Sequence, residues 1–141
     1  MNFFPTVWNV LHDGNIVNVT GQVPGALRVD VEIPYLRTRI PDPGKTIVIA
    51  LEGCSRFAYR NWDSEFITDL RAIVELKPAI VSAEMQGDLC CVYCVDGLFE
   101  VAVSSGTISL DSGRTLPLDE LIATADAYWE AWKKMWAERR L

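Results

Sequence analysis

The stretch 89–110 constrains the fold of this chain more than any other part. Two apolar runs are joined by Asp96-Gly97, and a third short run follows them. An Asp-Gly pair between two such runs is a strong hairpin signal, because a type I′ turn needs positive φ at both central residues. We therefore predict a β-hairpin with a type I′ turn, followed by a third strand.

Most of the remaining chain before residue 111 also has the patterns typical of strands. The clearest case is 27–33, where apolar residues alternate with Arg28, Asp30 and Glu32. This alternation predicts an antiparallel sheet with one face in water. We expect about seven to eight strands, and the sequence leaves open whether their sheet closes into a barrel. The expected strands, with a weak edge segment first, are 7–11, 16–20, 27–33, 47–51, 57–59, 80–85, 89–95, 98–103 and 107–110.

Two further segments have the patterns typical of helices. A short one lies near 68–76, with Thr68 as its N-cap and Pro78 as its stop. A long one runs from about 118 to 139 and carries an apolar stripe, which we expect to pack across a sheet. The stripe consists of Leu118, Leu121, Ile122, Ala125, Tyr128, Trp129, Trp132 and Trp136. The predicted fold class is therefore α+β, in a single domain spanning 1–141.

Charge and hydropathy exclude several function classes. The chain has 13 Lys and Arg against 19 Asp and Glu, a net charge of −6, and no basic cluster of the size that nucleic-acid binding needs. We expect no nucleic-acid partner. The longest apolar runs are strand-sized, which predicts no membrane span. The N-terminus lacks the basic region of a signal peptide, so we expect a cytoplasmic protein.

The cysteines suggest packing rather than chemistry. Cys90, Cys91 and Cys94 crowd into one predicted strand, and Cys54 is the only other thiol. Cys91 and Cys94 have the spacing of a zinc motif, but in a strand they face opposite sides. We interpret all four as reduced, buried thiols in a cytoplasmic protein, and we predict no metal and no cofactor.

Six residues are candidates for binding. His12 is the only histidine and adjoins Asp13. A turn would be enough to explain the presence of Asp13-Gly14 without any function. Trp136 lies among lysines and arginines near the end of the long helix, a composition typical of interface hot spots. Aromatic residues before and within the long helix could line a pocket for a small molecule. The candidates are His12, Asp13, Tyr59, Trp62, Trp132 and Trp136.

The opening Leu11-His12-Asp13-Gly14-x-Ile16, followed by the alternating run 27–33, resembles the start of small bacterial families of uncharacterised β-rich proteins. Some of these families are grouped with the immunity proteins of polymorphic toxin systems. The resemblance covers about the first quarter of the chain. It implies a cytoplasmic, acidic, non-enzymatic protein that neutralises a toxin by binding it.

Three hypotheses follow, in this order. The first is a protein-binding module of immunity type, which contacts a protein partner or forms a homodimer through the long helix. The second is a small-molecule binder with a pocket between the sheet and that helix. The third is an enzyme, which a lone histidine and the lack of a nucleotide loop or metal-ligand set disfavour. We therefore predict a non-enzymatic protein with no catalytic residues.

Overall fold

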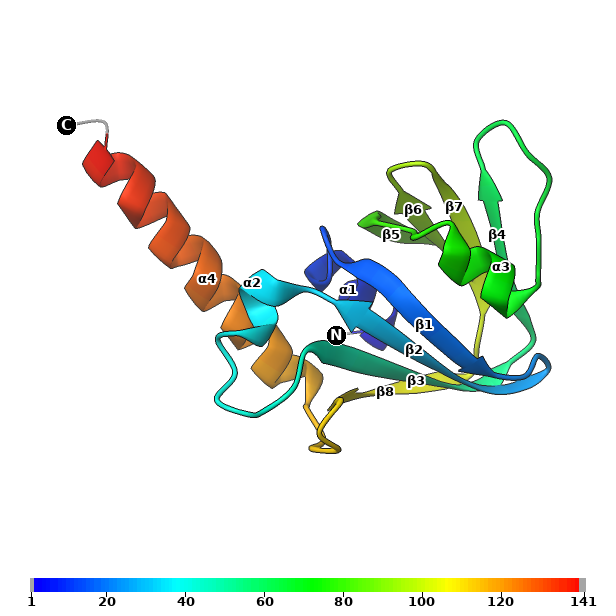
Figure 1. The fold of residues 1–141 in the computed structure, drawn as a ribbon, viewed down its shortest axis with the longest axis horizontal. Coiled ribbons are helices and arrows are strands. Elements are labelled where there is room, and N and C mark those ends of the chain that lie inside the picture. Colours follow the sequence, from blue (N-terminus) through cyan, green and yellow to red (C-terminus); the bar gives the residue numbers. More distant parts are fainter. Residues whose placement is uncertain (1, 140–141) are drawn as a thin grey trace.

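Eight strands form two antiparallel sheets of four strands each (Figure 1). This computed structural model describes residues 2–139. The first sheet has the order β1-β2-β3-β8 and the second β4-β7-β6-β5, and neither closes into a barrel within the described residues. The predicted α+β class and strand number are thus confirmed. The strands are β1 (Asn15–Gly21), β2 (Gly25–Glu32), β3 (Thr46–Cys54), β4 (Arg56–Asn61), β5 (Ile80–Gln86), β6 (Leu89–Cys94), β7 (Gly97–Ala102) and β8 (Ser105–Leu110).

The predicted hairpin is present as β6 and β7, but its turn type was predicted wrongly. Tyr93 pairs with Leu98, and neither Asp96 nor Gly97 has a positive φ. Gly97 instead allows β7 to approach β4 closely, because a Cβ at this position would lie 2.1 Å from the carbonyl oxygen of Arg60. The glycine is needed for contact with β4 and not for a left-handed turn.

Four helices connect and flank the sheets: α1 (Phe3–Val10), α2 (Pro34–Arg37), α3 (Leu70–Glu75) and α4 (Leu118–Arg139). The short helix predicted near 68–76 is α3, and its cap is Asp69 instead of Thr68, because the Asp69 carboxylate accepts from the Ala72 N–H at 3.0 Å. The long helix is α4. Pro34 ends the β2 ladder, as its missing N–H predicts, and it also opens α2, a helix that was not expected from the sequence.

The segment 7–11 was expected as a strand, and this prediction was wrong. It belongs mostly to α1, whose buried Val7 and Trp8 are followed by buried Leu11 at helical spacing. The Asn9 side chain makes the two backbone hydrogen bonds to β5 that a neighbouring strand would make. Its amide donates to the Ala83 oxygen at 3.0 Å and its oxygen accepts from the Ala83 N–H at 2.8 Å. Helix α1 thereby covers part of the free edge of β5.

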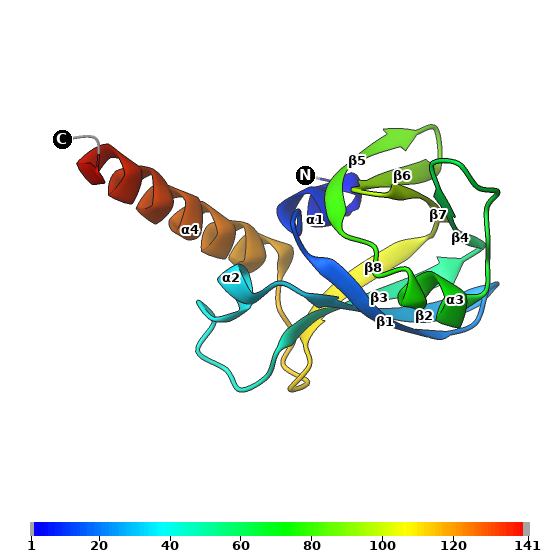
Figure 2. The ribbon, with the colours of Figure 1, turned by 45° about the horizontal axis from the view of Figure 1, so that its top comes forward.

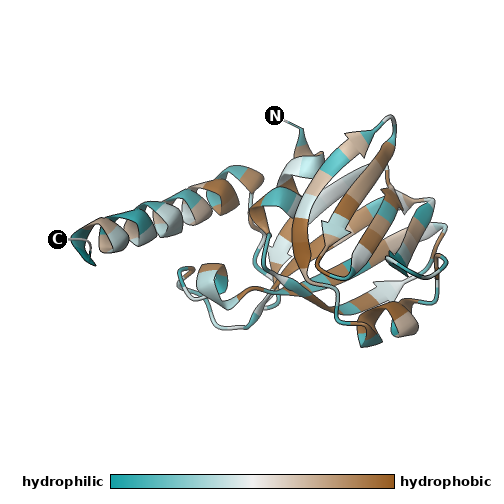
Figure 3. Ribbon diagram, turned by 90° about the horizontal axis from the view of Figure 1, so that it is seen from above, coloured by the Kyte–Doolittle hydropathy of each residue, from teal (hydrophilic) through white to brown (hydrophobic). Residues whose placement is uncertain are grey.

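One core fills the space between the sheets. Buried side chains of both sheets join those of α1, α3 and the first turns of α4 in a single cluster. Figure 3 shows the same distribution, with hydrophobic residues concentrated along the strands. The apolar faces of the sheets therefore cover each other, and α4 finds no open sheet face on which to lie.

The position of α4 corrects the prediction that its stripe packs across a sheet. Its main contacts are with α1 and α2. From there the helix runs outward and away from both sheets, as Figures 1 and 2 show from two directions. Only its first turns carry buried residues, Leu121 and Ala125. The stripe was read correctly as an apolar face, but the sequence does not state what covers it.

Arg37 fixes the loop between α2 and β3. Its side chain is only 3% exposed, and its guanidinium donates to Asp42 at 2.9 Å and to Asp111 at 3.1 Å. It also donates to the carbonyl oxygens of Thr46, Asp42 and Pro43. The arginine therefore ties this loop to β3 and to the turn after β8, next to the base of α4.

Candidate functional site

The outer half of α4 contains no buried or half-buried residue. Every residue from Glu130 to Arg139 is exposed, whichever side of the helix it lies on. We call this segment, residues 130–139, the arm. At 1.5 Å per residue it extends about 15 Å into solvent. Helices in proteins owe most of their stability to the packing of an apolar face, so an uncovered arm gains from being covered.

A row of rings leads from the body onto the arm, and we call it the aromatic ladder: His12, Trp129, Trp132 and Trp136. His12 stacks on Trp129 with 5.4 Å between centroids and 16° between planes. Trp129 and Trp132 are 5.8 Å apart, and Trp132 and Trp136 are 5.6 Å apart. The spacing of three and four residues places the three indoles on one side of the helix.

Tyr35 of α2 contacts residues at the base of the ladder, and we call this set of contacts the clasp. Its ring lies 4.6 Å from that of Tyr128 and 5.9 Å from that of Trp129, between centroids. Its hydroxyl donates to the His12 carbonyl oxygen at 2.7 Å. Burial, and then the nearby Asp13 and Tyr128, raise the pKa of Tyr35 to about 12, so the hydroxyl remains a neutral donor at physiological pH. The clasp holds α1, α2 and α4 together.

The apolar stripe continues from the buried base to the exposed arm. The face that buries Leu121 and Ala125 carries Trp132, Met135 and Trp136 farther out, and these are 40%, 42% and 43% exposed. Covering their exposed parts, on the order of 250 Å², would contribute about 6 kcal/mol before the costs of association.

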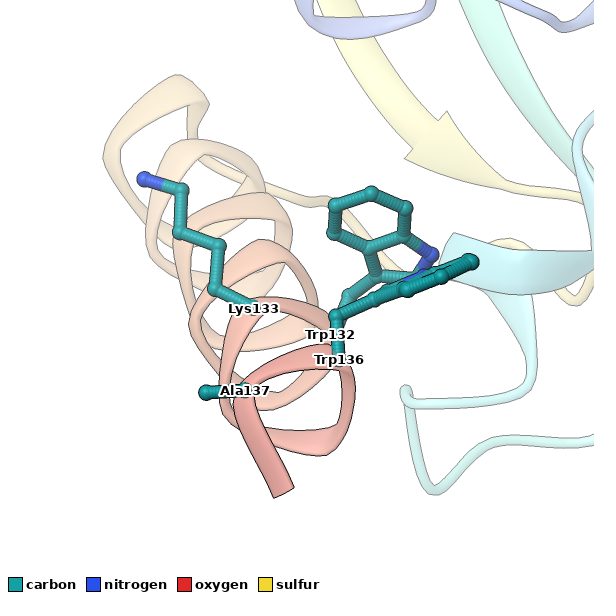
Figure 4. Close-up of a pocket in the computed structure, with 4 residues that line it drawn as sticks. All are labelled: Trp132, Lys133, Trp136 and Ala137. Carbon is teal, nitrogen blue, oxygen red and sulfur yellow. The ribbon is translucent and has the colours of Figure 1, made fainter. Parts of the chain in front are cut away.

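Figure 4 shows the two indoles of the arm pointing toward the side of α2, with Lys133 and Ala137 on another side of the helix. Together these four residues line an open hollow of about 340 Å³. Figure 3 colours this part of α4 in mixed shades, because tryptophan is close to neutral in hydropathy despite its large apolar surface.

The structure brings together only part of the predicted set of binding residues. His12, Trp132 and Trp136 belong to one aromatic ladder. Asp13 adjoins it in the predicted turn, where it is exposed, has a φ of 70° and donates its N–H to the Ile80 oxygen at 2.8 Å. Trp129, which the sequence analysis assigned to the core, is the link between His12 and the arm.

Tyr59 and Trp62 lie elsewhere. Tyr59 is fully buried against Phe99, at 4.5 Å between centroids, and its hydroxyl has no hydrogen-bond partner among the described residues. Burial, with smaller effects of Cys94 and Asp96, raises its pKa to about 12. Trp62 is 46% exposed and directly follows β4, a strand that lies on the far side of the molecule from α4 (Figure 1). The aromatic residues expected to line one pocket between sheet and helix are therefore apart.

Two contributors to the site were missed from the sequence. Tyr35 forms the clasp, and the Arg39 guanidinium lies 5.5 Å from the centre of the Tyr128 ring. Both depend on α2 meeting α4, and α2 is a single helical turn with no periodic pattern to reveal it. The sequence signal that did exist was the three tryptophans at helical spacing.

All four cysteines are free and buried. Cys90 and Cys94 face the core, whereas Cys91 lies outside the core cluster on the other face, as the strand pattern predicted. Burial raises the pKa of Cys90 and of Cys94 to about 12. Within residues 2–139, no group of three or more His, Cys, Asp or Glu side chains is placed to hold a metal ion.

None of the described helices is long and apolar enough to cross a membrane. Comparison of the chain with protein-family models, with curated proteins and with solved structures finds no match.

Proposed function

We propose that the protein is a binding module, without catalytic activity of its own, that docks on an α-helical surface of a protein through the arm. The observation that carries this proposal is the continuation of one apolar stripe from the buried base of α4 onto the uncovered arm. A helix face that is covered for half its length and aromatic for the other half fits a second helix laid along it.

The composition of the arm agrees with a contact surface. Tryptophan, tyrosine and arginine dominate the energetics of protein interfaces, since they combine a large apolar area with polar groups at the edge. Trp132 and Trp136 are flanked by Lys133 and Lys134, and Arg139 lies in the last turn. The indoles would supply the apolar centre of the contact, and these cations would form its polar rim.

The proposal includes a cytoplasmic location and an action like that of immunity proteins, which work by binding. The four buried, unpaired thiols support a reducing compartment. The resemblance of the opening segment to families that include such proteins supports the class of action. Neither observation identifies a partner, so the arm remains the basis of the proposal.

Site-specific photo-crosslinking in the native host tests this function. A photo-reactive benzoylphenylalanine replaces Met135, which lies on the arm and leaves both indoles in place. The control carries the same group at Val95, which is 63% exposed and lies in the loop between β6 and β7. We expect covalent adducts from position 135 and few from position 95.

The protein captured at position 135 is then purified and titrated with the unmodified chain. Saturable binding that the Trp132→Ala/Trp136→Ala variant loses supports the proposal. Adducts that form equally at both positions, or a captured protein that binds the variant as tightly as the wild type, would refute it.

A further inference from the structure

We propose that the helix that covers the arm is acidic: an amphipathic helix of another protein, whose apolar stripe is bordered by Asp or Glu side chains. This inference rests on the proposed function and names the chemistry of the partner at the same surface. Its evidence is the position of three cations around the exposed indoles and the position of the arm's carboxylates away from them.

Two cations of α4 border the exposed indoles. Lys133 lies three residues before Trp136 and Arg139 three residues after it, so both are neighbours of this indole on the helix surface. The ammonium of Lys133 lies 3.9 Å from the Glu130 carboxylate, and the two side chains are 69% and 78% exposed. An ion pair this exposed contributes little, so Lys133 can exchange it for a carboxylate of a partner.

A third cation lies at the base of the same face. Arg39 follows α2, is exposed, and has its guanidinium 5.5 Å from the centre of the Tyr128 ring. Within residues 2–139 it takes part in no ion pair. Tyr128 is one turn below Trp132, whereas Asp126 lies about 160° around the helix from Tyr128. A helix laid along the arm ends against α2, where it meets Arg39.

The carboxylates of the arm lie away from the indoles. Each residue turns the helix by about 100°, which places Glu130 and Glu138 about 100° or more from every tryptophan of α4. The arm as a whole is nearly neutral, but its aromatic face is bordered by cations. Such a face attracts an apolar stripe with an acidic border and repels one with a basic border.

The spacing of the cations predicts a pattern in the partner. Arg39 contacts α4 at Tyr128, and Arg139 lies eleven residues farther along, about 16 Å away. Eleven residues return an α-helix to nearly the same side. A partner helix parallel or antiparallel to α4 would therefore carry two carboxylates about eleven residues apart on one edge of its stripe. The contact spans about three turns, so we expect a dissociation constant in the micromolar range.

A helix fits this surface better than a bilayer of anionic lipids does. The exposed indoles point toward the side of α2, so the folded body bounds the aromatic face at its base (Figure 4). A bilayer would also set a continuous negative surface against the whole protein, whose net charge is −6. A helix brings only a few carboxylates to the three cations.

Two synthetic helical peptides test the inference. Both carry the same leucine stripe, and on its edge, at two positions about eleven residues apart, one peptide has Glu and the other Lys. Neither contains tryptophan, so the fluorescence of the protein's own indoles reports binding. We expect the Glu peptide to bind about ten-fold more tightly than the Lys peptide at low salt, and the difference to shrink in about 0.5 M NaCl.

Charge reversals in the protein locate the contact. Arg39→Glu and Arg139→Glu should each weaken binding of the Glu peptide about ten-fold. Arg71→Glu is the matched control, because it makes the same change of charge at an exposed position of α3, away from α4 (Figure 1). It should bind like the wild type. The Trp132→Ala/Trp136→Ala variant should bind neither peptide, and circular dichroism confirms that all variants are folded.

Equal affinity for both peptides, no binding of the Glu peptide, or equal effects of Arg39→Glu and Arg71→Glu would overturn the inference. Binding to phosphatidylglycerol vesicles without binding to the Glu peptide would also overturn it, in favour of a lipid surface. If the photo-captured protein binds through the tryptophans but Arg39→Glu and Arg139→Glu leave its affinity unchanged, the inference fails and the proposed function stands.

Discussion

His12 and Trp129 stack nearly parallel, with 5.4 Å between their ring centroids. His12 follows α1 and Trp129 lies midway along α4, so this contact joins the N-terminal helix to the point where the arm leaves the body. Replacing His12 by alanine should loosen the base of the arm and lower the free energy of unfolding by about 1 kcal/mol. Hydrogen exchange of residues 126–132 should accelerate.

His12→Phe is the matched control, because it keeps a flat ring against Trp129. We expect its hydrogen exchange to stay close to that of the wild type. A phenylalanine variant that loosens the helix as much as the alanine variant would show that stacking is not what holds the base.

Asp111 should make the free energy of unfolding depend on pH in the acidic range. Burial alone would raise its pKa, but donation from the Lys45 N–H at 2.7 Å and from Arg37 at 3.1 Å holds the pKa below its usual value. A depressed pKa stabilises the fold above the unfolded value, near pH 4, and this contribution disappears as the pH falls through the folded pKa. Urea unfolding at pH 7 and about pH 3 should show a smaller pH-dependent loss for Asp111→Asn than for the wild type. Equal losses would argue against this role.

The four thiols should be inert in the folded protein. They are buried, and burial raises the pKa of Cys90 and Cys94 to about 12, so the reactive thiolate is scarce and inaccessible. A thiol reagent at pH 8 should modify none of them in the native state and all four in denaturant. Ala137→Cys, on the exposed arm, provides the positive control and should react at once. Rapid modification of the thiols in the native wild-type protein would contradict their burial.

Gly97 and Gly87 should differ in their tolerance of alanine. At Gly97 a Cβ would lie 2.1 Å from the Arg60 oxygen, so alanine should cost about 3 kcal/mol or prevent folding. At Gly87 nothing lies within 4 Å and only the φ of 64° opposes the change, which should cost about 1 kcal/mol. Thermal or urea unfolding of both variants checks the order. A reversed order would contradict the close approach of β7 to β4.

The strands were predictable because their signal is local. In 27–33 the alternation of side chains is itself the pattern that a half-buried strand requires, and β2 forms there. The segment 7–11 failed because five residues are too few to separate a helix from a strand, and the helical spacing of Val7, Trp8 and Leu11 was overlooked.

The candidate site was only partly predictable, since it depends on contacts between distant elements. Trp136 was identified from its cationic neighbours, whereas Trp132 was expected to pack on a sheet and was a candidate only as a residue lining a pocket. Tyr35 carries no signal before α2 is placed beside α4. The stripe on α4 predicted an apolar face correctly, but whether a sheet, a helix or another chain covers such a face is decided by the packing of the rest of the protein.

Hydrogen exchange of the arm, in the free protein and with the photo-captured partner bound, tests the central claim most directly. In the free protein every residue from 130 to 139 is exposed, so the amides of the arm should exchange within seconds. With the partner bound, the account predicts slower exchange of these residues in the wild type and no change in the Trp132→Ala/Trp136→Ala variant. Exchange of the arm that is equally fast in both samples would contradict docking of a partner on the arm.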